Sequence, residues 1–184
     1  HPGAILYLHA EVTGLGGIGE DLRLVLRVAD LPPDRVFFPP QYELACGMLG
    51  SDHLAAAYAA ANVYLSASHG EGFGLPLYEA AMCGTSTIAP RNTAQAEVAT
   101  YLVDVVSYMP FDGATLWGRP TISGLVEALE RVASDAPDRD GVRSRVVPYD
   151  VDRIFQKRFL PALEKAMDVV RGFGATVGTN GENA

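Results

Sequence analysis

Short apolar runs alternate with amphipathic stretches along most of this chain. Runs of this length, bounded by polar or turn residues, are typical of strands buried in a parallel sheet. They lie at residues 4–9, 35–38, 63–65, 85–89 and 102–106. Apolar residues also recur at helical spacing, and the expected helices cover residues 22–29, 51–61, 76–83, 122–132 and the stretch from 151 onward.

The alternation of strands and helices predicts an α/β fold with a doubly wound parallel sheet and right-handed crossovers. We expect one domain over residues 1–171, with Pro161 kinking the last helix, and a disordered tail over the polar, glycine-rich residues 172–184. Residues 107–120 carry Trp117, the single tryptophan, and show no clear period. This stretch is either a packed loop or a partner surface, and the pattern does not decide between them.

Composition and charge narrow the class of protein. The chain has 184 residues, 48% of them hydrophobic, and a formal charge of −8. This negative charge argues against nucleic acids and anionic membranes as partners, because a protein that binds either needs an excess of Lys and Arg on its surface. The longest apolar run, residues 54–65, is too short to cross a bilayer, so no transmembrane segment is expected. Cys46 and Cys83 lack metal-ligand spacing and predict reduced thiols in a cytoplasmic protein, the alternative being one disulfide in a secreted protein.

A glycine-rich turn follows the third expected strand. In a doubly wound sheet, ligands bind beyond the carboxyl ends of the strands, so this turn is where a site is expected. Its glycines, Gly70, Gly72 and Gly74, let backbone amides approach a ligand with no Cβ in the way. The next helix, with Pro76 in its first turn, directs free N–H groups and the positive end of its dipole to the same place. These features predict an anion site suited to a diphosphate.

Two acidic residues flank this turn. Glu71 lies within it and Glu79 lies one helical turn into the following helix. An ionised carboxylate only accepts hydrogen bonds, so a pair beside an anion site suits the hydroxyl groups of a sugar better than phosphate. We therefore expect Glu79 to bind the ribose of a nucleotide and Glu71 to bind the donor sugar, with backbone amides of residues 73–75 between them. The structural alternative is that both acids stabilise the dipole at the start of the helix.

The turn and its flanks carry a recognisable motif, Glu71-Gly72-Phe73-Gly74-Leu75-Pro76, followed by Glu79-Ala80 and Cys83-Gly84-Thr85. This sequence resembles the signature of the GT-B fold, family 4 glycosyltransferases, whose two glutamates are also separated by seven residues. The likeness extends to residues 51–67 and 88–89, and more loosely to residues 4–38 and the last helix. The resemblance implies the C-terminal, Rossmann-like half of such an enzyme.

Several functional expectations come with that resemblance. Such enzymes bind a UDP-, GDP- or ADP-sugar and transfer the sugar to an acceptor hydroxyl with retention, requiring neither a metal ion nor another cofactor. Glu71 takes the catalytic position. The donor-binding positions are His69, Gly72, Phe73, Gly74, Leu75 and Glu79. For His69, donation to a phosphate and a purely local role in the turn both stay open.

The chain also departs from the family pattern. Ser86 stands where proline is usual. Residues 4–9 resemble the second strand of the family's domain, so the first strand, with its basic pair that clamps the diphosphate, has no counterpart. Nor does the N-terminal domain that would bind an acceptor glycan, lipid or protein, and the chain begins at His1 without an initiator methionine. Losing two charge-assisted contacts would cost about 2–5 kcal/mol of binding, so we expect this piece to fold but not to catalyse alone.

Other interpretations remain open. Residues 14–19 fit the G-x-G-x-x-G pattern of an NAD-binding Rossmann domain, yet the preceding strand ends too early and Pro39 and Pro40 stand where an acid should bind ribose. The plain alternative for that stretch is a flexible loop. Arg91 and Asn92 either face the ligand or lie in a solvated loop. A noncatalytic nucleotide-sugar-binding subunit fits the missing half, whereas a GT-B-like epimerase or phosphorylase is disfavoured by the glutamate spacing.

Overall fold

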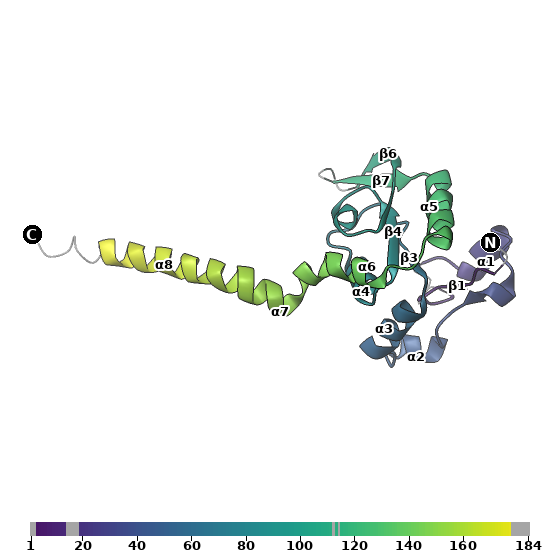
Figure 1. Ribbon diagram of the computed structural model, residues 1–184, viewed down its shortest axis with the longest axis horizontal. Coiled ribbons are helices and arrows are strands. Elements are labelled where there is room, and N and C mark those ends of the chain that lie inside the picture. The colour runs from purple at the N-terminus through teal and green to yellow at the C-terminus, as the bar shows by residue number, and fades with distance from the viewer. Residues whose placement is uncertain (1–2, 14–18, 112, 114, 178–184) are drawn as a thin grey trace, which may run out of the picture. The chain divides into compact units, whose positions relative to one another are not determined.

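The computed structural model describes residues 3–13, 19–111, 113 and 115–177 (Figure 1). The chain forms two compact units, residues 1–56 and 57–184. The single domain expected over residues 1–171 therefore stays a prediction. Most of the G-x-G-x-x-G stretch, residues 14–18, lies outside the described residues.

The first unit contains a parallel strand pair joined through a helix. Leu6 of the first strand lies opposite Val36 of the second. The connecting helix begins after Asp21, whose carboxylate accepts a hydrogen bond from the backbone N–H of Arg23 at 3.0 Å. The strand–helix–strand prediction is confirmed, with shorter strands than expected, and α2 is an addition. The elements are β1 (Leu6–Tyr7), α1 (Leu22–Val28), η2 (Pro33–Arg35), β2 (Val36–Phe37) and α2 (Gln41–Ala45).

The second unit is built on a three-stranded parallel sheet in the order β3-β4-β5. Its strands are β3 (Val63–Leu65), β4 (Ser86–Pro90) and β5 (Tyr101–Val103). The central strand is almost fully buried. All three match expected strands to within a few residues, because buried parallel strands consist of short continuous apolar runs.

Helices cover both faces of β4. Ala89 packs with α4 (Leu75–Met82) and α6 (Arg139–Val146), whereas Ile88 packs with α5 (Ile122–Ser134). Consecutive strand residues point to opposite faces, so these two neighbours belong to two separate core layers. This arrangement confirms the doubly wound α/β fold class. The helix α6, which begins after the capping carboxylate of Asp138, is an addition to the expected elements.

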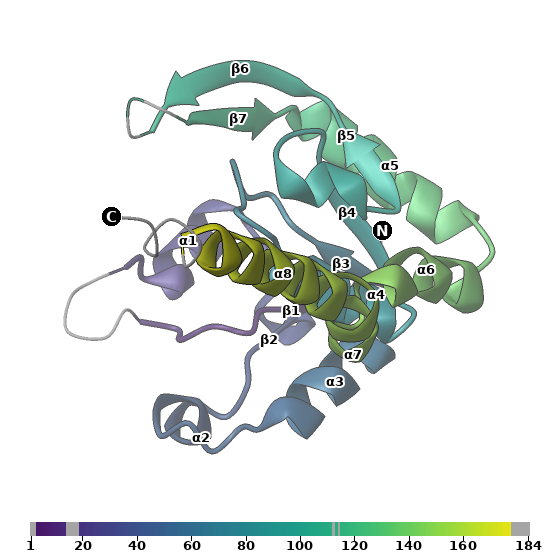
Figure 2. The same ribbon diagram turned by 90° about the vertical axis from the view of Figure 1, so that its left-hand side faces the viewer.

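The undecided stretch forms an antiparallel hairpin of β6 (Val105–Pro110) and β7 (Leu116–Pro120) (Figure 2). The fifth expected strand, residues 102–106, is thus divided at Asp104 between β5 and β6. A register shift between Val105 and Ser107 interrupts the pairing. Such a bulge disturbs the two-residue alternation, which explains why the sequence showed no period there.

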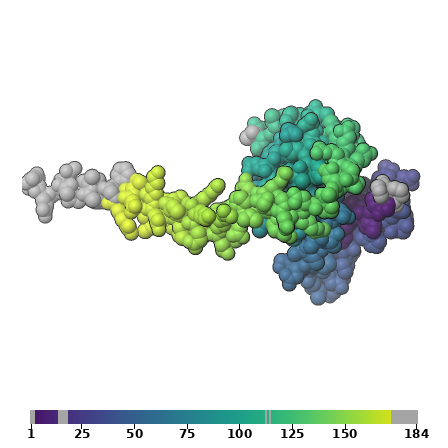
Figure 3. Space-filling model, in the orientation of Figure 1, coloured from purple at the N-terminus to yellow at the C-terminus, as the bar shows by residue number. Residues whose placement is uncertain are grey.

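The remaining elements are helical. They are α3 (Ser51–Ala60), η3 (Ala94–Glu97), η4 (Val147–Tyr149), α7 (Val151–Ile154), the π-helical η5 (Phe155–Phe159) and α8 (Leu160–Val177). The π-helical turn ends two residues before Pro161, where a kink was expected because proline removes a backbone donor from the helix. The helix α8, drawn in yellow in Figure 3, continues six residues past 171, and residues 178–184 lie outside the description. Among the described residues no helix has the length and apolarity to cross a membrane.

Candidate donor site at the turn between β3 and α4

The glycine-rich turn joins the carboxyl end of β3 to the start of α4, as expected. Gly74 precedes the helix with φ 80° and ψ 45°, in the left-handed region that glycine adopts without strain. No side chain caps this helix start, and Pro76 lies in its first turn. The backbone N–H groups at the beginning of α4 are therefore not covered by a capping side chain.

The glycines of the turn serve different purposes. A Cβ atom on Gly72 would meet nothing within 4 Å, so this backbone faces open space. A Cβ on Gly70 would come within 3.2 Å of Cδ1 of Trp117, so that glycine permits close packing of the hairpin. Open backbone at Gly72 is what an approaching ligand requires.

Glu79 is the fifth residue of α4 and lies on its exposed side. Its carboxylate oxygen Oε2 accepts a hydrogen bond from the Tyr58 hydroxyl at 3.1 Å. Burial raises the pKa of the Tyr58 phenol above its usual range, and the negative charge of Glu79 raises it further. The first turn of α4 contains no acidic residue, so Glu79 does not take the dipole-stabilising place that was the structural alternative. The Glu71 side chain lies 3.6 Å from where a Cβ on Gly74 would stand, directly before the helix, so that alternative stays open for Glu71.

Burial and the charges of Glu71 and Glu79 all raise the pKa of the partly buried Tyr64 phenol. Burial raises the pKa of Tyr64, and the charge of Glu71 and then that of Glu79 add to this effect. The Tyr64 phenol of β3 therefore lies in the electric field of both acids.

Hydrophobic members of the turn are exposed. Phe73 stacks on Tyr78 with ring centroids 4.5 Å apart and keeps 46% of its surface exposed. Leu75 is 60% exposed at the start of α4. The turn thus leaves apolar side-chain surface exposed at the start of α4.

The hairpin of β6 and β7, together with Asn92, holds the backbone of His69. The carbonyl oxygen of His69 accepts hydrogen bonds from the backbone N–H of Gly118 at 2.7 Å and from Nδ2 of Asn92 at 2.8 Å. The His69 ring lies 6.1 Å from the Trp117 ring, and Phe111 stacks on Trp117 at 3.9 Å. The tryptophan that sequence reasoning left unassigned is therefore part of the support for this turn.

A segment after β4 supports the rest of the turn. The backbone N–H of Glu71 donates to Oγ1 of Thr93 at 3.0 Å. Gln95, which is fully buried, donates from Nε2 to the carbonyl of Ser68 at 3.0 Å and accepts from the Ser66 hydroxyl at 3.2 Å. Sequence reasoning missed Thr93 and Gln95, although their position after a neighbouring parallel strand was a usable signal.

Arg91 and Asn92 take different places. Arg91 donates from Nε to the Asp104 carboxylate at 3.1 Å, on the exposed surface. Asn92 directs its amide to the His69 carbonyl. Of this pair, only Asn92 contacts the turn, and it does so as a support for the backbone.

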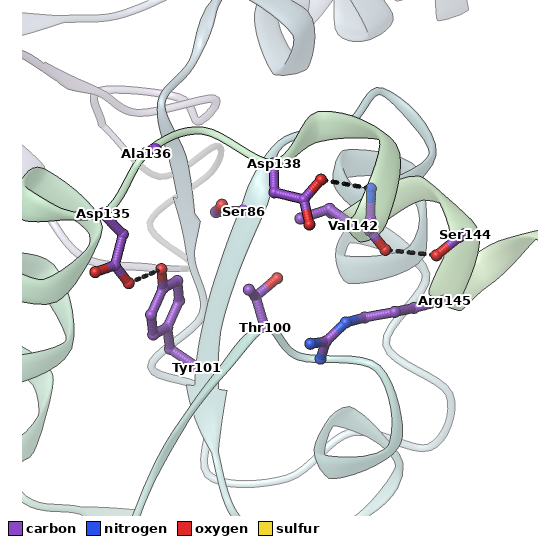
Figure 4. Close-up of a pocket in the computed structure, with 10 residues that line it drawn as sticks. Ser86, Thr100, Tyr101, Asp135, Ala136, Asp138, Val142, Ser144 and Arg145 are labelled. Carbon is purple, nitrogen blue, oxygen red and sulfur yellow. Dashed lines mark hydrogen bonds between the residues drawn. The ribbon is translucent and has the colours of Figure 1, made fainter.

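The cavity in Figure 4 lies elsewhere in the second unit. It has a volume of about 490 Å³ and is lined by residues including Ser86, Tyr101 and Asp138. Ser86 and Tyr101 begin their strands, so this cavity lies at the amino ends of β4 and β5, the edge opposite to the turn. Two of its carboxylates are already bonded, Asp135 to the Tyr101 hydroxyl at 2.6 Å and Asp138 to the Gly141 N–H at 2.9 Å. Its place in the fold does not favour it as the donor site.

No group of three or more His, Cys, Asp or Glu side chains that could hold a metal ion occurs among the described residues. Both cysteines are free, with Cys46 exposed and Cys83 partly buried.

The chain is similar to known proteins in sequence and in structure. Residues 16–135 match the family described as glycosyl transferases group 1. A sucrose-phosphate synthase from Thermosynechococcus elongatus is similar in structure with a TM-score of 0.60 and 23% identity, covering 88% of this chain and 39% of that one. The C-terminal domain of a glycosyl transferase group 1 family protein (LpcC) from Francisella tularensis gives a TM-score of 0.41 and 23% identity, covering 74% of this chain and 60% of that domain. A search of curated protein sequences finds no match. The chain thus spans less than two thirds of each of these structures.

Proposed function

The chain belongs to the glycosyl transferases of group 1, with the Rossmann-like half of a GT-B fold, and we propose that it is the donor-binding domain of a retaining, family 4 enzyme. In this proposal the whole protein transfers a sugar from a nucleoside diphosphate sugar to an acceptor hydroxyl. The chain covers only part of such proteins, so acceptor binding and the transfer step are assigned to the whole protein. The isolated chain is expected to show no turnover.

One observation carries the proposal. Two carboxylates flank a turn of open backbone at an uncapped helix start, with the Glu71 side chain beside Gly74 and Glu79 held by the Tyr58 hydroxyl. The N–H groups of Phe73, Gly74 and Leu75 suit the diphosphate, Glu79 suits the ribose hydroxyls and Glu71 suits the hydroxyls of the donor sugar. In this proposal the ring of His69, which lies at the same turn, donates to a phosphate oxygen.

The chemistry assigned to this arrangement is same-face substitution. The acceptor oxygen forms a bond to the anomeric carbon while the bond from that carbon to the diphosphate oxygen breaks, and the acceptor proton passes to the departing phosphate. Backbone N–H groups at the helix start stabilise the negative charge that develops on the leaving group. Glu71 orients the sugar, and neither glutamate forms a covalent intermediate.

Two further parts of the proposal concern conditions. No metal ion is required, so a chelator should leave transfer intact in the full-length protein. A cytoplasmic location is proposed from the two free thiols, since such thiols persist in a reducing compartment.

Calorimetric titration tests the site. The full-length protein that carries this chain is titrated with UDP-glucose, GDP-mannose and ADP-glucose, and with UDP, GDP and ADP. Glu71→Gln should weaken the binding of the sugar nucleotide but not that of the free nucleotide, whereas Glu79→Gln should weaken the binding of both. Each substitution should lower the rate of transfer about 100-fold or more. Near-normal binding and rates in both variants would remove the site assignment. Tight binding without transfer to any acceptor would instead favour a noncatalytic binding subunit.

A further inference from the structure

Thr93 has a backbone conformation that is unusual for its residue type. Its φ is 53° and its ψ is −157°, in a region populated almost only by glycine. A β-branched residue with positive φ is a clear outlier, because its Cβ substituents collide with the backbone. Glycine at this position would remove the collision.

The other described non-glycine residue with positive φ is Asp30, with φ 51°. Aspartate tolerates the left-handed region better than threonine does, and Asp30 lies one residue past the C-cap of α1, where such a conformation is common. The strain at Thr93 has no comparable local explanation. Its side chain must therefore contribute something that glycine would lack.

That contribution is visible in the hydrogen bonds. The Thr93 hydroxyl accepts the backbone N–H of Glu71 at 3.0 Å, and its methyl group lies 3.5 Å from where a Cβ on Gly70 would stand. Neighbouring side chains hold the preceding part of the turn at carbonyl groups, Asn92 at His69 and Gln95 at Ser68. Thr93 thus fixes the amide of the residue that carries the proposed sugar-binding carboxylate.

We propose that Thr93 is a positioning residue that holds Glu71 for the donor sugar, and that its strained backbone is retained because only a side chain with a hydroxyl can do this. The inference rests on the proposed function and deepens it. Glu79 has a separate support, the Tyr58 hydroxyl. Loss of the Thr93 hydroxyl should therefore affect recognition of the sugar and leave recognition of the nucleotide unchanged.

The test compares Thr93→Ser, Thr93→Ala and Thr93→Gly in the full-length protein. The readout is the ratio between the affinity for UDP-glucose, GDP-mannose or ADP-glucose, whichever binds, and the affinity for the matching nucleoside diphosphate. The Ala and Gly variants should lower this ratio about tenfold, and the Ser variant should keep it within about twofold, because serine retains the hydroxyl. Thr93→Gly should unfold at a higher temperature than Thr93→Ala, since both lack the hydroxyl and only glycine is free of strain.

Two controls separate the outcomes. Asp30→Gly relieves the other positive φ and should leave the affinity ratio unchanged. Thr93→Ala added to Glu71→Gln should cause no further loss in the affinity ratio, because Thr93 acts on the sugar only through the carboxylate that Glu71→Gln removes. An unchanged ratio in both Ala and Gly variants, with a clear loss in Glu71→Gln, would overturn the role of Thr93 and leave the proposed function standing. No loss in Glu71→Gln, or no binding of any sugar nucleotide, would overturn both.

Discussion

Tyr58 donates its hydroxyl to the Glu79 carboxylate at 3.1 Å, so a residue near the end of α3 orients an acid on α4. The Tyr58 ring also meets the Tyr64 ring edge-on, with centroids 5.7 Å apart. Tyr58 thus lies between Glu79 and the Tyr64 phenol, whose pKa is raised by burial and also by the charge of Glu71. The two acids of the candidate site therefore have supports from different parts of the second unit.

Tyr58→Phe should weaken the binding of sugar nucleotide and of free nucleotide by the same factor. The substitution removes one hydrogen bond to Glu79, the residue assigned to ribose, and a bond of this kind contributes about 1 kcal/mol, or about fivefold in affinity. Calorimetry on both ligands measures the two factors. Tyr42→Phe, at an exposed tyrosine of the first unit, is the matched control and should change neither. A loss confined to the sugar nucleotide would contradict the assignment of Glu79 to ribose.

Stability should fall at alkaline pH because of the phenols near the acids. Burial, followed by the charges of Glu71 and Glu79, raises the pKa of Tyr64 above its ordinary value of 10.0, and Tyr58 is raised in the same direction. Above pH about 10 the unfolded chain loses these protons while the folded chain keeps them, so the contribution to stability is complete below that pH and declines above it.

Urea unfolding at pH about 9 and about 11 measures this decline in the free energy of unfolding. Tyr64→Phe should make the decline smaller, because one of the shifted phenols is removed. Tyr42→Phe again serves as the control and should leave the decline as it is. A Tyr64→Phe variant with the same decline as the unmodified protein would show that the Tyr64 phenol is not held neutral by its surroundings.

Gly74→Ala should lower the free energy of unfolding, whereas Gly72→Ala should lower the affinity for the donor. A methyl group at Gly74 is forced into a left-handed conformation with φ 80°, which should cost about 1–2 kcal/mol of unfolding free energy. A methyl group at Gly72 meets nothing within 4 Å, so its stability should change little. Donor affinity should nevertheless fall in Gly72→Ala, because the added carbon stands where the ligand approaches the backbone. Urea unfolding and calorimetry together distinguish the two, and full donor affinity in Gly72→Ala would place the ligand elsewhere.

Gly118→Ala should loosen the hairpin from the turn. A Cβ on Gly118 would lie 2.8 Å from Nδ2 of Asn92 and 2.9 Å from Cγ1 of Val105, so one of these neighbours must move. Moving Asn92 breaks its bond to the His69 carbonyl, and we expect a loss of about 1–3 kcal/mol in unfolding free energy together with weaker donor binding. A Cβ on Gly113, in the same stretch, would meet nothing within 4 Å. Because the φ of Gly113 is 79°, the variant Gly113→Ala serves as a control for backbone strain alone. An unchanged free energy of unfolding in Gly118→Ala would show that packing against Asn92 and Val105 adds nothing.

The local order of the candidate site could be predicted from the sequence. Val63–Leu65 is a short apolar run, three glycines follow it, and Pro76 begins a helix with apolar spacing. Each of these signals depends on neighbours within a few residues, which is why strand, turn and helix were found with errors of one or two residues. The positions of Glu71 in the turn and Glu79 in the helix follow from the same local signals.

Other elements gave too little local signal. The helix α6 buries only Val142 and Val146, so an apolar period cannot be read from it. The hairpin of β6 and β7 contains a register shift that breaks the two-residue alternation. Both elements form because the rest of the second unit offers them a surface, α4 for the helix and the glycine-rich turn for Trp117.

The sequence by itself determined that a strand, an open glycine turn and an uncapped helix carry two acids in order, because these are matters of neighbouring residues. Only the tertiary structure decided which side chains hold those acids. Tyr58 lies 21 residues before Glu79, and Thr93 lies 22 residues after Glu71. Such pairs meet because parallel strands bring their carboxyl ends to one edge and helices pack across the sheet, and no periodicity along the chain records which residues that packing will bring together.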